Sequence, residues 1–457
     1  GYGMKSHIIE GNNIIEVYTK VSAVAEEIRK NPHPVLLEFK TFRMRGHEEA
    51  SGNKYVPKEL LDVWAKKDPI ENFQNFLIHE NILTKEQEIT IEKEFTREID
   101  RNLKLAFEEK EIQFNLKNEL GDLFQDFDYQ EVKKNNKKSN IRLIDAISKG
   151  LYQSMERHPE MVIMGQDIAE YGGVFKVTEG FLEKFGKDRI RNTPICESSI
   201  IESAYGLSIS GIKSVVELQF SDFVSSGFNP VINLLAKSHY RWGQNADIVL
   251  RMPCGAGVGA GPFHSQTNEA WFTKTPGLKV VYPAFPYDAK GLLATAIEDP
   301  NPVLFFEHKK LYRSVYQDVP DDYYTIPLGK AMLLSEGNTV SIITYGAGVH
   351  WALEIVKKEN IDADIIDLRT LQPLDTESIY SSVKKTGKAI ILQEDTMFGG
   401  VASDISALIT ENCFEYLDAP VKRVASLEIP IPFAKELEKG YLPINRFEEA
   451  IKELLGY

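Results

Sequence analysis

The sequence predicts an α/β protein with mainly parallel sheets, and three observations support this. Short apolar runs recur along the chain, and segments with helical periodicity separate them. Most of the runs are apolar at nearly every position, which is typical of parallel strands covered by helices on both faces. At 457 residues the chain is long enough for about three domains of ~150 residues each.

The composition narrows the class of protein. Hydrophobic residues make up 43% and charged residues 26%, as in ordinary globular enzymes. The formal net charge of −14 argues against nucleic acid or an anionic membrane as the main partner. No apolar run approaches the ~20 residues that span a bilayer, and we expect no signal peptide. Cys196, Cys254 and Cys413 lie far apart without metal-type spacing, so we expect a reducing compartment, the cytoplasm.

The first predicted α/β segment covers residues 1–126. Apolar residues at steps of three and four from Ile14 to Ile28 predict a helix, and Pro34–Phe39 predicts a strand. Charged, helix-prone sequence follows at 84–120. A helix and a strand with no partner before them are typical of the second half of a domain, so we expect an N-terminal truncation.

Two further α/β domains are expected after a linker. The lysine-rich stretch EVKKNNKKSN predicts a solvated linker at 127–140 rather than a nucleic-acid-binding arm. A periodic helix from Leu143 opens a domain at 141–325, and an irregular stretch at 318–324 precedes a C-terminal α/β domain at 326–457. The predicted strands lie in runs that begin at Met161, Lys213, Asp247, Leu278, Val303, Thr339, Ala363 and Lys388.

A glycine-rich loop, GAGVGAG, follows the predicted strand at Asp247. It superficially resembles a dinucleotide-binding loop. The required helix does not open there, because Pro262 and FHSQ follow, and no acidic residue closes the unit about 20 residues later. We expect instead that the loop brings backbone close to a ligand or to the next histidine, His264.

Four segments place an ionisable or aromatic side chain at the end of a probable strand: FRMRGH, NTPICE, ELQFSDF and GPFHSQ. In open α/β sheets, sites form beside the carboxyl ends of the strands. The candidate residues in these segments are His47, Glu197, Phe223 and His264. Structural roles remain as alternatives: Glu197 as an acid at a helix N-terminus, Phe223 as a core residue and His264 as a loop histidine.

Longer stretches around these motifs resemble a known family. Five stretches from about Leu143 onward resemble the β subunit of the branched-chain 2-oxo acid and pyruvate dehydrogenase decarboxylase components: MGQDIAEYGGVFKVTEGF, KFGKDRIRNTPICE, HSQTNEAWFTKTPGLKVVYPAFPYDAKGLL, AIEDPNPVLFFE and IDLRTLQPLD. Residues 1 to about 80, with FRMRGH and KDPIENFQNFL, resemble the carboxyl-terminal part of the α subunit. The resemblance implies transketolase-like, thiamine-diphosphate-binding domains in a fused α–β chain of bacterial type.

The resemblance also implies roles for the candidate residues. Glu197 matches the glutamate that hydrogen-bonds the ring nitrogen of the aminopyrimidine and favours its imino tautomer. His264 matches the histidine that helps to transfer the acyl group to the lipoyl arm of the acyltransferase. His47 matches the α-subunit histidine near the diphosphate. The positions that line the aminopyrimidine are matched by Ile195, Gln219 and Phe223.

Two metal sites are implied by the same resemblance. The family holds Mg²⁺ and diphosphate through a Gly-Asp-Gly segment and an Asn pair upstream of the position that matches Gly1, so we expect most of that site to lie outside this chain. A structural monovalent cation, K⁺ in the family, is bound mostly by backbone carbonyls, and the resemblance implies the Asp299 side chain as a further oxygen ligand. Its matching positions are Ile248, Ala296, Ile297, Asp299 and Asn301.

The expected function is oxidative decarboxylation of a 2-oxo acid, with acyl transfer to lipoamide of the acyltransferase. We favour branched-chain acids of the 2-oxoisovalerate type, because PICE, QFSDF and GPFHSQ are closer to that branch, and pyruvate is the alternative. A transketolase or deoxyxylulose-phosphate synthase would carry further histidines and basic residues for a sugar phosphate, which these motifs lack. A non-catalytic docking subunit is a further alternative, against which the retention of Glu197, His264 and His47 argues.

Assembly and regulation are expected from the resemblance as well. The family's two-α, two-β arrangement would become a homodimer of fused chains. Mammalian relatives carry a phosphorylatable serine just after the histidine matched by His47, and this chain has Glu48 there. We therefore do not expect kinase control at that position.

Overall fold

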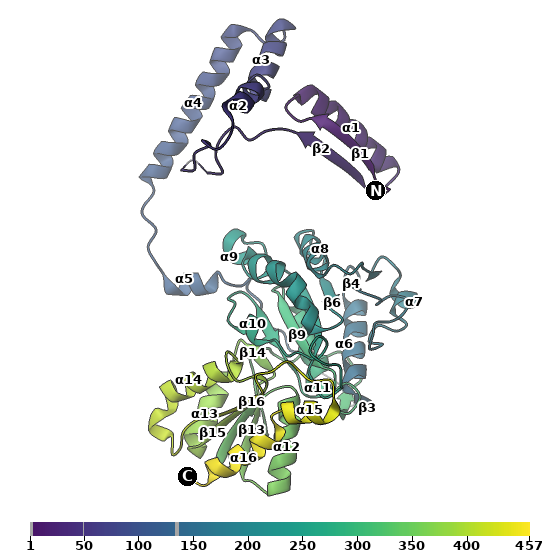
Figure 1. Cartoon of the computed structure of the whole chain (residues 1–457), viewed down its shortest axis with the longest axis vertical. Helices are drawn as coiled ribbons and strands as arrows, with labels where there is room; N and C mark the ends of the chain where they lie inside the picture. The colour runs from purple at the N-terminus through teal and green to yellow at the C-terminus, as the bar shows by residue number, and fades with distance from the viewer. Residues whose placement is uncertain (1–2, 49, 133–136) are drawn as a thin grey trace. The chain divides into compact units, whose positions relative to one another are not determined.

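The computed structural model describes residues 3–48, 50–132 and 137–457. The chain folds into two compact units, residues 1–113 and 114–457 (Figure 1). The second unit contains both of the predicted domains that follow the linker. Residues 114–126, which were expected to belong with the N-terminal segment, fold with the second unit; the domain limits themselves stay a prediction.

The first unit opens with a parallel β-α-β arrangement. Strand β1 (Lys5–Glu10) pairs in parallel with β2 (Val35–Lys40), and helix α1 (Ile14–Lys30) connects the two strands. The side chain of Asn13 caps this helix by accepting the N–H of Glu16 at 3.2 Å. The predicted helix and strand are both confirmed.

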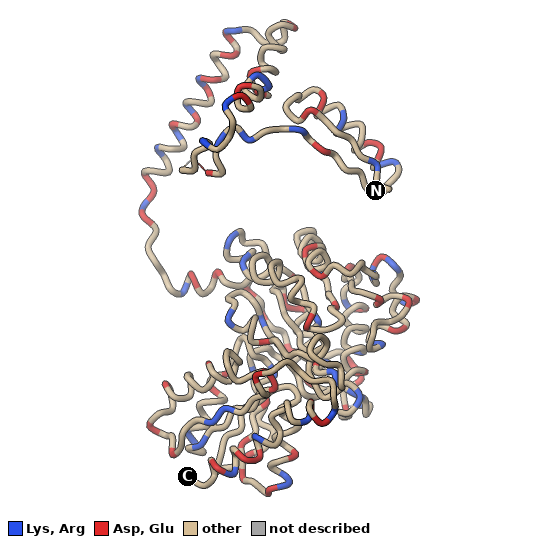
Figure 2. The backbone as a smooth tube through the Cα atoms, viewed as in Figure 1, with Lys and Arg blue, Asp and Glu red and all other residues tan. Residues whose placement is uncertain are grey.

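Three helices complete the first unit: α2 (Lys58–Ala65), α3 (Pro69–His79) and α4 (Lys85–Glu108). A capping box starts α4, because the Gln87 N–H donates to Thr84 Oγ1 and the Thr84 N–H donates to Gln87 Oε1. Acidic and basic residues alternate along α4 (Figure 2). Neither α4 nor any other helix in the described part of the chain is long and apolar enough to cross a membrane.

A seven-stranded sheet forms the centre of the second unit, in the order β14-β8-β9-β7-β6-β4-β5. Every neighbouring pair is parallel except β14 with β8. The apolar runs predicted five of these strands, whereas β5 and β14 carry no such run. The strands are β4 (Val162–Gly165), β5 (Ile190–Asn192), β6 (Ser214–Glu217), β7 (Ile248–Cys254), β8 (Lys279–Val281), β9 (Val303–His308) and β14 (Thr370–Gln372).

Both faces of this sheet are buried. Val215 and Val216 are neighbours on β6, and they belong to two separate hydrophobic clusters. Since successive strand residues point to opposite faces, each face packs its own core, as expected for parallel strands. Helices α6 (Leu143–Arg157) and α11 (Pro286–Glu298) pack against each other in one of these layers (Figure 1). The other helical segments are α7 (Phe181–Phe185), α8 (Glu197–Ile209), η1 (Ser221–Gly227), η2 (Pro230–Leu235), α9 (Ser238–Trp242) and α10 (Ala270–Thr273).

The C-terminal domain has a five-stranded sheet in the order β11-β13-β12-β15-β16. All pairs are parallel except β11 with β13, and the three strands predicted here are confirmed. The strands are β11 (Met332–Ser335), β12 (Val340–Thr344), β13 (Ala363–Asp367), β15 (Ala389–Thr396) and β16 (Lys422–Ser426). The helices are α12 (Ala347–Glu359), α13 (Thr376–Thr386), α14 (Val401–Cys413), η3 (Phe414–Tyr416), α15 (Lys435–Tyr441) and α16 (Ile444–Leu455).

The predicted linker is only partly a linker. Lys138–Arg142 forms strand β3, which pairs antiparallel with β10 (Tyr316–Pro320) in the stretch expected to be irregular. Before it, Thr325 Oγ1 accepts the N–H of Val132 at 3.0 Å and lies 3.2 Å from the hydroxyl of Tyr129. Residues 133–136 lie outside the described residues. The lysines made this segment resemble a solvated linker. Its last residues form a strand because the distant strand β10 provides their backbone hydrogen-bond partners.

Helix α5 (Leu116–Gly121) lies ahead of this segment and contacts α9. The hydroxyl of Tyr240 donates to Glu119 at 2.6 Å, and a ring nitrogen of His239 lies 2.9 Å from the Asp122 carbonyl. These contacts attach α5 to the second unit.

Candidate active site

Four neighbouring strands of the seven-stranded sheet end at one edge, where polar side chains gather. Strands β5, β4, β6 and β7 are adjacent and parallel. Gln166 follows β4, Glu197 follows β5, Gln219 follows β6 and the loop with His264 follows β7. Because the carboxyl ends of parallel strands meet at the same edge, this is where an open α/β sheet forms its site.

Glu197 is the first residue of α8, and only 7% of its surface is exposed. The amide of Gln166 donates to its Oε1 at 3.1 Å, and the Gln166 side chain is also buried. Glu197 therefore combines the predicted strand-end position with the helix N-terminal position that was its structural alternative. Its partner is a neutral amide, so the carboxyl group is oriented without an opposing charge.

The ring of His264 forms an aromatic cluster with the rings of Phe220 and Phe223. The His264 ring centroid lies 4.8 Å from that of Phe220 and 5.5 Å from that of Phe223, in edge-to-face contacts. The two phenylalanine rings lie 5.6 Å apart. Phe223 and His264 are half-buried, so Phe223 is not a fully buried core residue.

The η1 segment links Glu197 to this cluster. Phe223 lies within η1, and Gly227 ends it against the start of α8. A Cβ atom at Gly227 would lie 3.5 Å from the Glu197 carbonyl oxygen and 2.5 Å from Cδ1 of Ile201, so a larger residue here would displace the end of the Ile201 side chain. Element η1 thus carries Phe223 and also packs against α8, the helix that begins with Glu197.

Two further predicted cofactor contacts lie beside these groups. Ile195 stands in the loop before α8 and is 83% exposed, so its side chain is available to a ligand. The Gln219 amide lies 3.5 Å from Asp167 Oδ2, and Asp167 follows Gln166 after β4. Both residues are at the strand-end edge that the sequence predicted.

A buried ion cluster underlies this edge. The guanidinium of Arg251 donates two hydrogen bonds to Glu307, at 2.7 and 2.8 Å, and a third to Glu217. The Tyr312 hydroxyl donates to Glu307 at 2.6 Å. Burial raises the pKa of Glu217 although Arg251 opposes this shift. The cluster ties β6, β7 and β9 together, and sequence analysis missed it because its members lie on different strands.

His47 lies in the first unit, on an exposed segment between β2 and α2. Glu48 is also exposed, and Ser51 Oγ donates to Glu48 Oε1 at 3.2 Å. His47 is therefore not among the residues that the second unit brings together.

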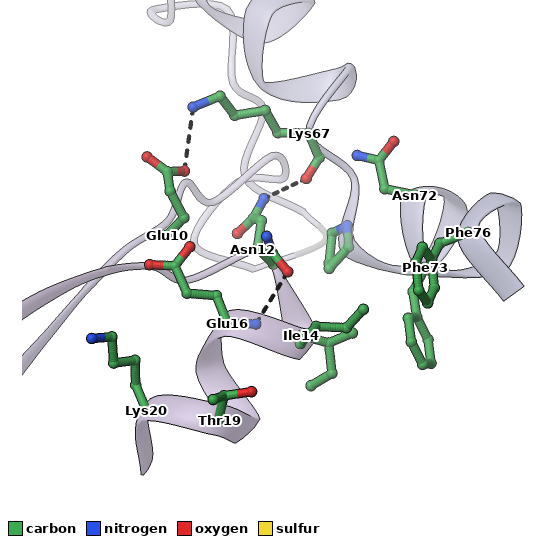
Figure 3. A pocket seen from close by; sticks show the side chains of 13 residues that line it. Glu10, Asn12, Ile14, Glu16, Thr19, Lys20, Lys67, Asn72, Phe73 and Phe76 are labelled. Atoms are coloured by element: carbon green, nitrogen blue, oxygen red, sulfur yellow. Dashed lines mark hydrogen bonds and ion pairs between the residues drawn. The ribbon is translucent and has the colours of Figure 1, made fainter. Parts of the chain in front are cut away.

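The first unit also contains a pocket of about 700 Å³ (Figure 3). Asn12 Nδ2 donates to the Lys67 carbonyl at 2.7 Å, and Lys67 Nζ lies 3.4 Å from Glu10 Oε2. Phe73 and Phe76 form part of its apolar wall. None of the candidate residues lines this pocket.

The positions matched to a monovalent-cation site lie where α11 ends and where β7 begins, and all are buried. In a continued helix the carbonyl of Ala296 would accept from Pro300 and that of Ile297 from Asn301. Pro300 has no N–H, and the Asn301 N–H donates to Asp299 Oδ1 at 3.0 Å. These two helix-end carbonyls are hard oxygen donors of the kind that fits a cation.

The carboxylate of Asp299 does not fit the same expectation. Lys279 Nζ lies 2.5 Å from Asp299 Oδ2, and Asn301 Nδ2 donates to Asp299 Oδ1 at 2.8 Å. The side chain is already neutralised and hydrogen-bonded, which leaves the backbone carbonyl as the group of Asp299 that fits a cation. In the described part of the chain, no group of three or more His, Cys, Asp or Glu side chains could hold a metal ion.

Family profiles match most of the chain. Residues 139–315 match the transketolase pyrimidine-binding domain, and residues 329–446 match the transketolase C-terminal domain. Residues 1–115 match the dehydrogenase E1 component. The α-like and β-like parts thus occur in the order that the sequence predicted.

Curated relatives match about 70% of the chain. The 2-oxoisovalerate dehydrogenase subunit beta of Bacillus subtilis (strain 168) is 44% identical over 327 residues, which is 70% of this chain and 100% of that subunit. The pyruvate dehydrogenase E1 component subunit beta of the same organism is 42% identical over 313 residues, 67% of this chain and 96% of that subunit. The mitochondrial 2-oxoisovalerate dehydrogenase subunit beta of Dictyostelium discoideum is 41% identical over 336 residues, 72% of this chain and 90% of that subunit.

A solved structure shares the fold. It is described as a split gene transketolase, inactive beta4 tetramer, with a TM-score of 0.57 and 22% sequence identity. The match covers 70% of this chain and 99% of that one, and it confirms the transketolase-like α/β fold. The chain therefore belongs to the 2-oxo acid dehydrogenase E1 family of thiamine-diphosphate-dependent enzymes, and it joins α-like and β-like parts in one polypeptide.

Proposed function

We propose that this E1 protein decarboxylates a branched-chain 2-oxo acid of the 2-oxoisovalerate type and passes the acyl group to lipoamide of an acyltransferase. The 44% identity to a 2-oxoisovalerate dehydrogenase subunit supports this substrate. Pyruvate is the second candidate, because a pyruvate dehydrogenase subunit is 42% identical. The observation that carries the catalytic part is the buried carboxyl group of Glu197 at the strand-end edge, oriented by Gln166.

Glu197 would hold a proton at the aminopyrimidine ring nitrogen of thiamine diphosphate. When bound, the cofactor supplies the electron sink that a 2-oxo acid needs to lose carbon dioxide. Gln166 occupies Oε1, so Oε2 is the oxygen that we assign to the cofactor. Phe223 and Ile195 would pack on the aminopyrimidine, and Gln219 would offer a polar contact beside them.

His264 is the residue that we assign to acyl transfer. Its ring lies in edge-to-face contact with Phe220 and Phe223, and we assign its nitrogens to proton transfer with a lipoyl thiol or an acyl oxygen. His264 is half-buried, which suits a step in which a second protein must reach the reacting group. His47, from the α-like unit, is proposed to act near the diphosphate.

The metals, assembly and compartment are part of the same proposal. Mg²⁺ would accompany the diphosphate. K⁺ would bind backbone carbonyls, including those of Ala296 and Ile297, whose regular helical donors are missing. We also propose a homodimer of fused chains in the bacterial cytoplasm.

The test is turnover by the full-length protein with thiamine diphosphate, Mg²⁺ and an artificial electron acceptor. We expect kcat/KM for 2-oxoisovalerate to exceed that for pyruvate by about tenfold, the scale on which small apolar side chains are discriminated. A reversed order would assign the enzyme to pyruvate. Turnover of a ketose phosphate would favour a transketolase, and no turnover with any substrate would favour a docking subunit.

Acylation of a lipoyl domain tests the second half of the proposal. The isolated lipoyl domain of an acyltransferase is added in place of the artificial acceptor, and its acylated form is measured by mass spectrometry. We expect acylation with the preferred 2-oxo acid. Decarboxylation without acylation would restrict the function to the first step.

A further inference from the structure

The glycine-rich loop after β7 has an unusual backbone. Gly255, Gly257, Gly259 and Gly261 have φ angles of +90°, +85°, +72° and +71°, which L side chains rarely adopt. Left-handed residues that alternate along a chain turn successive N–H groups inward, and such a nest binds anions. The loop is therefore built to receive a negative charge.

The chain supplies that charge itself. Oε1 of Glu438 accepts the N–H of Gly257 at 2.8 Å and the N–H of Gly259 at 3.1 Å, and Oε2 lies 3.1 Å from the Gly259 nitrogen. Glu438 is on α15 of the C-terminal domain and is only 4% exposed. This explains why the loop has the glycines of a phosphate-binding turn without the helix of a nucleotide site.

A second buried carboxylate holds the start of the loop. The Ala256 N–H donates to Glu394 Oε1 at 2.6 Å, and Glu394 Oε2 lies 2.6 Å from Nε2 of His308. Burial opposes the charge of Glu394, but His308 and the Ala256 N–H together keep its pKa below the usual value. Lys309 Nζ donates to the Gly255 carbonyl at 2.8 Å.

The far end of the loop is anchored beside η1. The N–H of Gln266 donates to Asp222 Oδ1 at 3.2 Å, and its carbonyl accepts from Ser221 Oγ at 2.9 Å. Its side-chain amide donates to the Pro262 carbonyl at 2.9 Å. His264 thus lies between two fixed points, the nest at Gly257 and Gly259 and the contact with η1.

We propose that Glu438 is a positioning residue, through which the C-terminal domain holds the His264 loop in the geometry needed for acyl transfer. Glu438 acts on the backbone of the nest and not on the reacting groups. Since His264 itself contacts only Phe220 and Phe223 among the ring contacts described, its position depends on the loop that carries it. The proposal rests on the proposed role of His264 in acyl transfer.

The first test measures the loop without any catalysis. Glu438→Gln keeps the size of the side chain but removes the charge that both N–H groups share, and Glu438→Ala removes every acceptor. Hydrogen–deuterium exchange of the 255–264 segment is expected to become about tenfold faster in the Gln variant and faster still in the Ala variant, because charge-assisted bonds are lost. Glu436→Gln, on the same helix but exposed, is the matched control and should leave the exchange unchanged.

The second test separates the two half-reactions in the full-length protein. Lipoyl-domain acylation is expected to fall about tenfold in Glu438→Gln and further in Glu438→Ala, because a loosened loop misplaces His264. Turnover with the artificial acceptor should stay within about threefold of wild type, because Glu197 lies on another element. Wild-type protein that fails in both assays would contradict the proposed function, whereas the exchange result would still decide the role of Glu438 at the nest.

Any of four results would overturn the proposal. Unchanged exchange in both Glu438 variants would mean that the carboxylate does not hold the loop. Equal losses of both half-reactions, or acylation within twofold of wild type, would separate the loop from acyl transfer. Failure of the isosteric Gln variant to fold would make Glu438 a general structural residue. If only Glu438→Ala fails to fold, the Gln variant carries the test.

Discussion

The side-chain amide of Gln166 donates a hydrogen bond to Oε1 of Glu197 over 3.1 Å, and both side chains are buried. The amide is neutral, so it fixes the plane of the carboxyl group without adding a charge. One oxygen of Glu197 is thereby engaged within the protein, and we assign the other to the cofactor. The first two predictions depend on this pair.

Glu197→Gln in the full-length protein should lower turnover by about a thousandfold or more, because an amide cannot supply a titratable proton at the ring nitrogen. Stability should change little, since the amide oxygen of the substituted side chain can still accept from Gln166. Turnover with the artificial acceptor and the thermal midpoint together measure the two effects. A variant within tenfold of wild type would remove Glu197 from its catalytic role.

Gln166→Glu should shift the pH profile of kcat/KM to higher pH by about one unit or more. Two carboxyl groups at this distance disfavour double ionisation, so the pKa of the pair rises. Gln166→Met has a side chain of similar length and does not introduce the negative charge of the Glu variant. It should lower the rate but leave the pH profile of kcat/KM unshifted. An unshifted profile for the Glu variant would show that residue 166 does not govern the ionisation of Glu197.

His264→Ala should reduce lipoyl-domain acylation about a hundredfold, a typical loss for a positioned proton-transfer group, and reduce decarboxylation much less. Phe263→Ala is the matched control, because Phe263 is the preceding residue and is 67% exposed. Both half-reactions are measured on the same preparations. Equal losses in the two steps would count against the assignment of His264 to acyl transfer.

Stability should depend on pH through Glu269. Burial, and then the charge of Asp395, raise the pKa of Glu269 to about 8, and the Tyr345 hydroxyl donates to its Oε1 at 2.7 Å. The folded state therefore retains a proton that the unfolded state releases near its ordinary pKa of 4.5. Protonated Glu269 therefore stabilises the folded state relative to its ionised form. This contribution to the free energy of unfolding is fully present below pH 4.5 and is lost as the pH rises toward 8.

Glu269→Gln removes this titration. The free energy of unfolding of the variant, minus that of wild type, should therefore increase by up to about 1.4 kcal/mol per pH unit between about pH 5 and 8, because only wild type loses stability over this range. Denaturant unfolding of both proteins at several pH values measures the difference. A difference that is constant with pH would mean that Glu269 titrates alike in the folded and unfolded states.

Features that are local in sequence were predicted well. Strands β7 and β9 are mainly apolar, with Arg251, Glu307 and His308 as the charged or titratable exceptions, and the apolar pattern predicted their burial on both faces. The position of Glu197 beside a strand end follows from the order of strand, turn and helix in one short segment. Gln166 is also a polar residue at a strand end, because it directly follows the apolar run of β4. The same strand-end criterion could therefore have identified it as a candidate site residue.

Features that depend on distant partners were not predicted. Strand β3 looks like a lysine-rich linker until β10 pairs with it, with Asn140 and Asp318 separated by 178 residues. The partner of the glycine-rich loop, Glu438, is 181 residues from Gly257. The carboxylate of Asp299 was expected to be available to a cation, and its ion pair with Lys279 forms only in the fold. Local periodicity and spacing in the sequence do not predict these long-range contacts.

The most direct test of the catalytic account is an experimental structure of the full-length protein with thiamine diphosphate bound. The account predicts that a carboxyl oxygen of Glu197 lies about 2.6–3.2 Å from the aminopyrimidine ring nitrogen, with Gln166 still bound to the other oxygen. A cofactor whose ring nitrogen faces any other side chain would contradict it, and membership of the family would then reflect shared ancestry without this chemistry.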